Sequence, residues 1–333
     1  MAFPARRFPG TLAGLLVLAA VCAPGASAAE AGAKAEGPAE AAAQKPRELP
    51  AALSKKREVR ELEGELVDIR TADGWTLSGR HFESSEEDKL TFILLHDARG
   101  RKQNWYWLAR DMARRGIGYL AIDLRGHGLS QSAPEGQPSS WREFQVGKRR
   151  NDWDNMREDV AAAARFLTEK GVPEESIALG GANVGGSIAL KYAALHPEIA
   201  MVFILSPGMS YREVLTVNAM RAYRDRPILL VVGDDDRRSS TETPILFEFA
   251  KRSVGEENAT LMRVPRGHGT RMLYYSRKTL VPDILEWIDN PITVLEPDVS
   301  TDTLTSPGSE GAGLPSDDDL ERIAEEPAHP ADD

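Results

Sequence analysis

Short, nearly unbroken apolar runs recur along the middle of the chain and alternate with longer amphipathic stretches. Runs of this kind are typical of strands buried on both faces, and they occupy 90–96, 117–123, 176–181, 201–206, 227–233 and 259–265. Helical spacing of apolar residues predicts helices over 104–115, 154–170, 187–196, 243–252 and 280–289. The alternation predicts an α/β fold, with a mostly parallel sheet covered on both faces after a hairpin around Ala72-Asp73-Gly74.

The amino-terminal segment has the order of a cleavable export signal. A basic start is followed by an apolar run over 12–23 and by small residues up to Ala28. The run is shorter than the roughly 20 residues of a membrane span. We therefore expect cleavage after Ala28, a periplasmic or secreted protein, and no stable membrane span once the signal is removed. The single cysteine, Cys22, lies in this signal, and Ala20-Val21 before it fits lipid attachment poorly.

The remaining composition predicts one folded domain between two flexible ends. Residues 29–56 form an Ala/Glu/Pro-rich spacer, 57–295 the α/β domain, and 296–333 a disordered acidic tail. The net charge of −10 comes from that tail, which holds twelve acidic residues and one basic residue. The sequence has no basic stripe interleaved with aromatic residues, so we do not expect a nucleic-acid partner.

Three loops that follow predicted strands carry residues with catalytic potential. They are Gly181-Ala182-Asn183-Val184-Gly185, Asp234-Asp235-Asp236 and Gly267-His268-Gly269. Upstream, LLHDARG (94–100) and DLRGHGLS (123–130) also follow strands. In this order the five motifs resemble the α/β-hydrolase family, in particular its small esterase, lysophospholipase and dienelactone-hydrolase-like members, over about residues 64–289.

The resemblance assigns a role to each motif. Asn183 stands at the nucleophile position, where the family pattern G-x-S-x-G has serine. His268 would be the general base and Asp236 the acid that fixes its tautomer, with Asp234 and Asp235 as rivals for the acid. The oxyanion hole would use the backbone N–H groups of Val184 and Ala98. His96 and His127 would brace the loops, and Asp97 would oppose a developing negative charge unless Arg99 neutralises it.

Asn183 sets the functional expectation because an amide is neither a base nor a conventional nucleophile. We predict a very weak or inactive hydrolase that binds a small acyl or ester-like ligand, without a metal or an organic cofactor. Three alternatives stay open: a water activated by His268 and Asp236, a substitute serine, or deamidation of Asn183 to aspartate. The candidate serines are Ser130, Ser187 and Ser206. The segment 207–226 is too short for a large cap, so an open pocket is expected, with Met209, Tyr211 and the 131–141 loop as lining.

Overall fold

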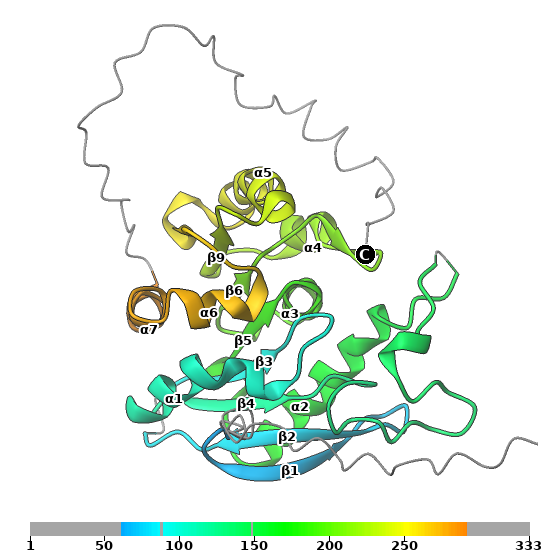
Figure 1. Ribbon diagram of the computed structural model, residues 1–333. Coiled ribbons are helices and arrows are strands. Elements are labelled where there is room, and N and C mark those ends of the chain that lie inside the picture. Colours follow the sequence, from blue (N-terminus) through cyan, green and yellow to red (C-terminus); the bar gives the residue numbers. More distant parts are fainter. Residues whose placement is uncertain (1–60, 87–88, 148, 292–333) are drawn as a thin grey trace, which may run out of the picture. The chain divides into compact units, whose positions relative to one another are not determined.

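An eight-stranded, mostly parallel sheet forms the centre of the computed structural model, which describes residues 61–86, 89–147 and 149–291 (Figure 1). In spatial order the strands are β1 (Glu65–Arg70), β2 (Thr76–Phe82), β4 (Gly118–Ile122), β3 (Thr91–Leu95), β5 (Ile177–Ala182), β6 (Val202–Leu205), β9 (Ile228–Gly233) and β10 (Ala259–Val264). The β1–β2 and β2–β4 pairs are antiparallel, and all pairs from β4 to β10 are parallel. The predicted fold class and hairpin are confirmed. The predicted export signal, Cys22, the spacer and the acidic tail lie outside the described residues.

Helices cover both faces of the sheet (Figure 1). The helices are α1 (Tyr106–Arg114), α2 (Arg157–Glu169), α3 (Val184–Leu195), α4 (Val217–Ala222), α5 (Arg237–Val254), α6 (Met272–Tyr275) and α7 (Leu280–Asp289). Strand side chains alternate between the two faces. Ile93 and Leu95 belong to the core shared with α2 to α5, whereas Phe92 and Leu94 belong to the core shared with α1, α6 and α7. This two-sided burial explains the unbroken apolar runs.

Two helices begin earlier than the apolar spacing predicts. Helix α3 begins at Val184 rather than Ser187, because the intervening glycines adopt helical conformations that bring the helix close to β5. Helix α5 begins at Arg237 rather than Thr243, and the Asp236 side chain caps it by accepting a hydrogen bond from the N–H of Ser239 at 3.4 Å. The apolar pattern misses both starts because their first turns are built from polar residues or glycine.

The connections at the carboxyl ends of the strands differ in length. Between β6 and β9 the chain forms only the small β7 (Ser210–Tyr211) and β8 (Val214–Leu215) pair and α4, in keeping with the absence of a large cap there. The 123–153 connection between β4 and α2 is long, and an aromatic cluster anchors it. Trp141 stacks on His127 with ring centroids 5.6 Å apart and meets Trp153 edge-on at 6.1 Å.

A buried ion pair ties the loop after β3 to the loop after β4. Lys102 and Asp123 are each 1% exposed, and Lys102 Nζ lies 2.6 Å from Asp123 Oδ2. The same ammonium donates to Ser78 Oγ at 3.0 Å, and the Asp123 carboxylate also accepts from the backbone N–H groups of Lys102 and Leu129. Satisfied in this way, the pair fixes the two loops that flank the candidate site.

None of the helices in the described ranges combines the length and apolar character needed to cross a bilayer.

Candidate functional site

Asn183 occupies a strained turn between β5 and α3. Its backbone has φ 53° and ψ −121°, a conformation that few non-glycine residues adopt, and the residue is 6% exposed. A Cβ at Gly181 would lie 2.5 Å from the carbonyl oxygen of Gly185, and a Cβ at Gly185 would lie 2.5 Å from that of His96. The glycines thus permit the sharp turn and the close approach of the loop after β3.

Replacing Gly185 with alanine is expected to destabilise the fold by about 1–3 kcal/mol, since the added methyl group meets backbone rather than a movable side chain. Chemical denaturation would measure the loss. The exposed Gly171 is the control, because a Cβ there would meet nothing within 4 Å. Its φ is positive, so any loss of unfolding free energy in Gly171→Ala reports conformational strain alone. Equal losses in both variants would contradict the steric explanation.

The structure brings Asp236 to His268. Nδ1 of His268 lies 2.6 Å from Asp236 Oδ2. Asp234 instead pairs with Arg263 at 2.9 Å, and Asp235 accepts a hydrogen bond from the backbone N–H of the residue before His268. Of the three consecutive aspartates, only Asp236 is therefore placed to orient the imidazole.

Asp236 is held in its ionised form. Burial acts to raise its pKa, but hydrogen bonds from His268, Ser239 and Ser206, together with the attraction of His268, outweigh burial and lower the pKa to about 2. A carboxylate facing Nδ1 requires the proton of the neutral imidazole to sit on that nitrogen. Nε2 of His268 then presents its lone pair to the turn at residue 183.

The side-chain amide of Asn183 bonds to the two groups to which the resemblance assigns catalytic roles, the imidazole of His268 and the backbone N–H of Val184. Nδ2 lies 3.0 Å from His268 Nε2, and Oδ1 accepts the backbone N–H of Val184 at 2.7 Å. The orientation is internally consistent, because exchanging O and N would place donor against donor at Val184. The predicted oxyanion donor of Val184 is thus already engaged by Asn183, and so is the lone pair of the predicted base.

The loop after β3 contacts two other loops, the one that carries His268 and the one that follows β4. Asp97 Oδ2 accepts the hydroxyl of Thr270 at 2.9 Å, and the carbonyl of Ala98 lies 2.9 Å from Nε2 of His127. The carboxylate of Asp97 therefore bridges two loops, a role that the sequence did not indicate. Arg99 faces cavities together with Trp141.

His96 is a neutral brace, as the resemblance implied. Nδ1 donates to the carbonyl of Asp97 at 2.8 Å, while Nε2 accepts the N–H of Leu124 at 3.0 Å. Complete burial lowers the pKa of His96 below its ordinary value of 6.5. A proton on Nε2 would remove the bond from Leu124, so this geometry also favours the neutral ring.

This shift predicts a pH effect on stability. Because the folded pKa is lowered, the contribution of His96 is complete above pH 6.5 and is lost as pH falls through the lower folded value. We expect His96→Gln to lose less unfolding free energy than wild type on going from about pH 7.5 to about pH 5, measured with urea. His81, whose pKa burial also lowers, acts equally in both proteins. The pKa of His127 is lowered by burial and also by the neighbouring His96, so His96→Gln reduces the His127 contribution too, in the same direction. Identical losses would contradict this role.

The three candidate substitute serines are buried. Ser130 and Ser206 are 0% exposed and Ser187 is 2% exposed. Ser130 Oγ donates to the carbonyl of Asp123, and Ser187 Oγ bonds to Thr216 Oγ1. A ligand at the turn reaches none of these hydroxyls without rearrangement of the core.

Sequence reasoning missed the supporting role of Ser206. Its hydroxyl accepts the N–H of Gly269 at 2.8 Å and bonds to Asp236, while its backbone has φ 51°. Tyr211, which was expected in the pocket, is largely buried; its ring meets that of His268 edge-on at 6.4 Å, and its hydroxyl bonds to Ser239 Oγ at 3.0 Å. The sequence did carry a signal for Ser206, because a serine directly after an apolar strand lies at the carboxyl edge of the sheet, where ligand sites form.

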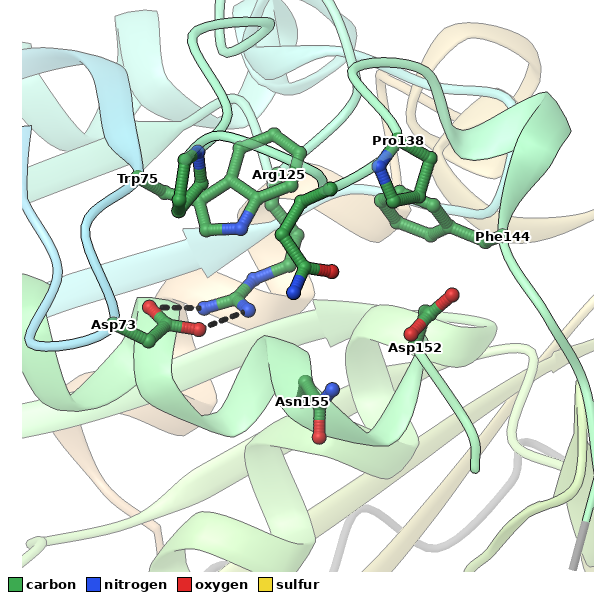
Figure 2. Close-up of a pocket in the computed structure, with 9 residues that line it drawn as sticks. Asp73, Trp75, Arg125, Pro138, Phe144, Asp152 and Asn155 are labelled. Atoms are coloured by element: carbon green, nitrogen blue, oxygen red, sulfur yellow. Dashed lines mark hydrogen bonds and ion pairs between the residues drawn. The ribbon is translucent and has the colours of Figure 1, made fainter. Parts of the chain in front are cut away.

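Another cavity, of about 110 Å³, lies beside the hairpin (Figure 2). Trp75 and Phe144 contribute its aromatic walls, and Arg125 forms a forked ion pair with Asp73 along one side. Arg125 also binds the buried Asp159 at 2.7 Å, so its charge is balanced by two carboxylates. These contacts make it a structural ion-pair network. Across 61–86, 89–147 and 149–291, no three histidine, cysteine, aspartate or glutamate residues are grouped as metal ligands.

Comparison with solved structures decides the fold. An esterase of Pyrococcus furiosus, Pf2001, superposes with a TM-score of 0.56 at 18% identity, over 70% of this chain and 92% of that chain. The protein has the α/β-hydrolase fold. A dienelactone hydrolase of Anabaena variabilis matches this hydrolase-fold chain with a TM-score of 0.54 at 17% identity, over 68% of this chain and 97% of that one. At such identities the likeness establishes the fold alone.

Sequence comparisons point the same way. Residues 87–227 of the hydrolase-fold chain match the family model described as serine aminopeptidase, S33, a range that includes Asn183 and ends before Asp236. An AB hydrolase superfamily protein of Bacillus subtilis (strain 168), YisY, is 25% identical over 170 residues. That match covers 50% of this chain and 55% of the relative, so the chain spans about half the length of the curated relative.

Proposed function

We propose that this protein binds a small acyl or ester-like ligand at a hydrolase-type site in which hydrolysis through a serine is disabled. The observation that carries the proposal is the double contact of the Asn183 amide with His268 Nε2 and with the N–H of Val184. In this proposal His268 is the base and the N–H of Val184 an oxyanion donor, but the group between them cannot form an acyl-enzyme.

Ligand binding at this site is an exchange of hydrogen bonds. A ligand carbonyl is the natural replacement for Asn183 Oδ1 on the N–H of Val184, since both are neutral oxygen acceptors. When the amide rotates away, His268 Nε2 becomes free to accept a hydrogen bond from a ligand hydroxyl or amide. The expected ligand therefore combines a carbonyl with a nearby donor.

A second candidate function is hydrolysis by an activated water, and the intact histidine–aspartate pair favours it. The His268 side chain is 45% exposed and is held by Asp236 at 2.6 Å. Water could attack the ligand carbonyl while its proton passes to Nε2, after which the tetrahedral intermediate would expel the alcohol with that proton. This route requires the Asn183 amide to leave Nε2 first.

A fluorophosphonate probe and a p-nitrophenyl ester distinguish the two functions. If the protein binds the ester without chemistry, the probe does not label it and its ester turnover does not exceed that of a His268→Ala variant. The ester should nevertheless raise its melting temperature. Turnover that disappears in His268→Ala would support the activated water. Labelling of the natural protein would overturn both, because it would reveal an activated nucleophile.

Deamidation of Asn183 would supply a carboxylate nucleophile, and intact mass of the peptide that contains residue 183 tests it. We expect an unmodified amide, because the β-branched Val184 follows. A peptide with aspartate in the purified, ester-active protein would replace the binding proposal with covalent catalysis.

We also propose that the protein is exported, on the signal-like order of residues 1–28. Expression in a bacterial host with fractionation is expected to give a mature protein that begins at Ala29. Full-length protein confined to the cytoplasm would contradict this proposal.

A further inference from the structure

Two cavities that share Arg99, Trp141 and Arg142 are lined by arginines. One, of about 520 Å³, is lined by Arg99, Arg101, Trp141 and Arg142 among others. The other, of about 220 Å³, shares Arg99, Trp141 and Arg142 and adds Arg212. Among the described residues that line these two cavities there is no aspartate or glutamate. We call this pair of cavities the arginine basin.

The arginine basin continues from the loop that carries the predicted oxyanion donor. Arg99 directly follows Ala98, and the carbonyl of Ala98 lies 2.9 Å from His127 Nε2. The ring of His127 in turn stacks on Trp141, which lines both cavities. Arg99 and His127 therefore connect the basin to the loop that carries Ala98.

Aromatic contacts hold part of the basin in place. The guanidinium carbon of Arg142 lies 4.6 Å from the ring centroid of Trp141, and that of Arg212 lies 5.4 Å from the centroid of Trp153. The two tryptophans pack edge-on, and Trp141 is stacked on His127 at an interplanar angle of 9°. Restricting these side chains before binding lowers the entropy lost when they contact a ligand.

We propose that the arginine basin binds an oxyanion group, a phosphate or a carboxylate, carried by the ligand. Guanidinium groups present paired N–H donors that match both kinds of oxyanion. The positive charge is local, since the whole chain carries −10. The binding of an oxyanion is inferred from the residues of the basin alone. The further statement that this oxyanion belongs to an acyl or ester-like molecule rests on the proposed function.

The test uses hexyl phosphate, hexanoate and hexanol as probes that share an apolar chain and differ in charge, with binding followed by calorimetry. We expect hexyl phosphate or hexanoate to bind at least about tenfold more tightly than hexanol, and a rise from about 50 to about 300 mM NaCl to weaken binding. The tighter of the two anions identifies the oxyanion. Arg99→Gln with Arg142→Gln is expected to weaken it at least about tenfold, because each charge-assisted hydrogen bond contributes substantially.

Arg114→Gln is the matched control, because this arginine is 65% exposed on α1 and lines neither cavity. Hexanol binding as tightly as both anions, or equal weakening by Arg114→Gln, would overturn the proposal. Thermal melting confirms that each variant is folded; if the double variant fails to fold, the single Arg142→Gln and the salt dependence decide. Ester turnover in Asn183→Ser tests the proposed function separately. Oxyanion binding without ester turnover rejects only the proposed function, and ester turnover without oxyanion binding rejects only the proposal for the basin.

Discussion

Asn183→Ser is expected to hydrolyse short p-nitrophenyl esters at least about 10³-fold faster than the natural protein, against the roughly six orders of magnitude lost when a protease serine is removed. Serine would place a hydroxyl near His268 Nε2, and Asp236 already holds the tautomer that accepts its proton. The change also removes Oδ1 from the N–H of Val184, which becomes free to stabilise the oxyanion. Initial rates and fluorophosphonate labelling would measure both effects.

Two variants control this result. Asn183→Ala frees the same N–H but supplies no hydroxyl, so it should remain unlabelled. His268→Ala in the serine background should remove most of the gained turnover, since the hydroxyl then lacks its base. A serine variant that folds, melts like the natural protein and shows neither turnover nor labelling would mean that Asn183 is not the main obstacle to hydrolysis.

Lys102→Met is expected to lower the free energy of unfolding by about 3–5 kcal/mol, because it leaves the carboxylate of Asp123 buried without its cation. Both groups are 1% exposed, and solvent cannot compensate for the lost charge. The two backbone N–H groups that Asp123 also accepts offset only part of the penalty. Urea denaturation at neutral pH would give the difference.

Arg114→Met offers a comparison at an exposed ion pair. Arg114 lies 3.2 Å from Asp111 on α1 and is 65% exposed, so its removal should change stability by less than about 1 kcal/mol. If Lys102→Met were as stable as Arg114→Met, the buried pair would have no role in holding the two loops together. Paired with Asp123→Asn, which neutralises the stranded carboxylate, the lysine variant should recover part of its loss.

Much of the fold could be predicted because burial leaves a direct mark on the sequence. Phe92 to Leu95 face helices on alternate sides, and the run is therefore apolar throughout. The position of Asn183 was also predictable, since the glycines around it are required by backbone contacts. Helix starts were less accessible, because α5 begins through the polar cap of Asp236 rather than through an apolar stripe.

The chemistry of the site was only partly predictable. The resemblance to the α/β-hydrolase motifs placed Asn183 at the turn, but it gave no orientation for the amide, because a side-chain torsion depends on partners that are distant in sequence. His268 and Val184 lie on opposite sides of that amide in the structure. The bond between Asp97 and Thr270 was equally hidden, since 173 positions separate the two residues.

The amide of Asn183 leaves His268 Nε2 and the N–H of Val184 already engaged in hydrogen bonds in the resting site. Exchanging one neutral hydrogen bond for another contributes little net free energy, since each bond is worth about 1 kcal/mol. If the proposed function holds, recognition of a ligand then comes from groups outside the turn, through shape and charge along the walls. Under the proposed function, a site with these two groups free would capture many carbonyl compounds, whereas this one, occupied by its own amide, would admit only those whose other parts offset the displacement.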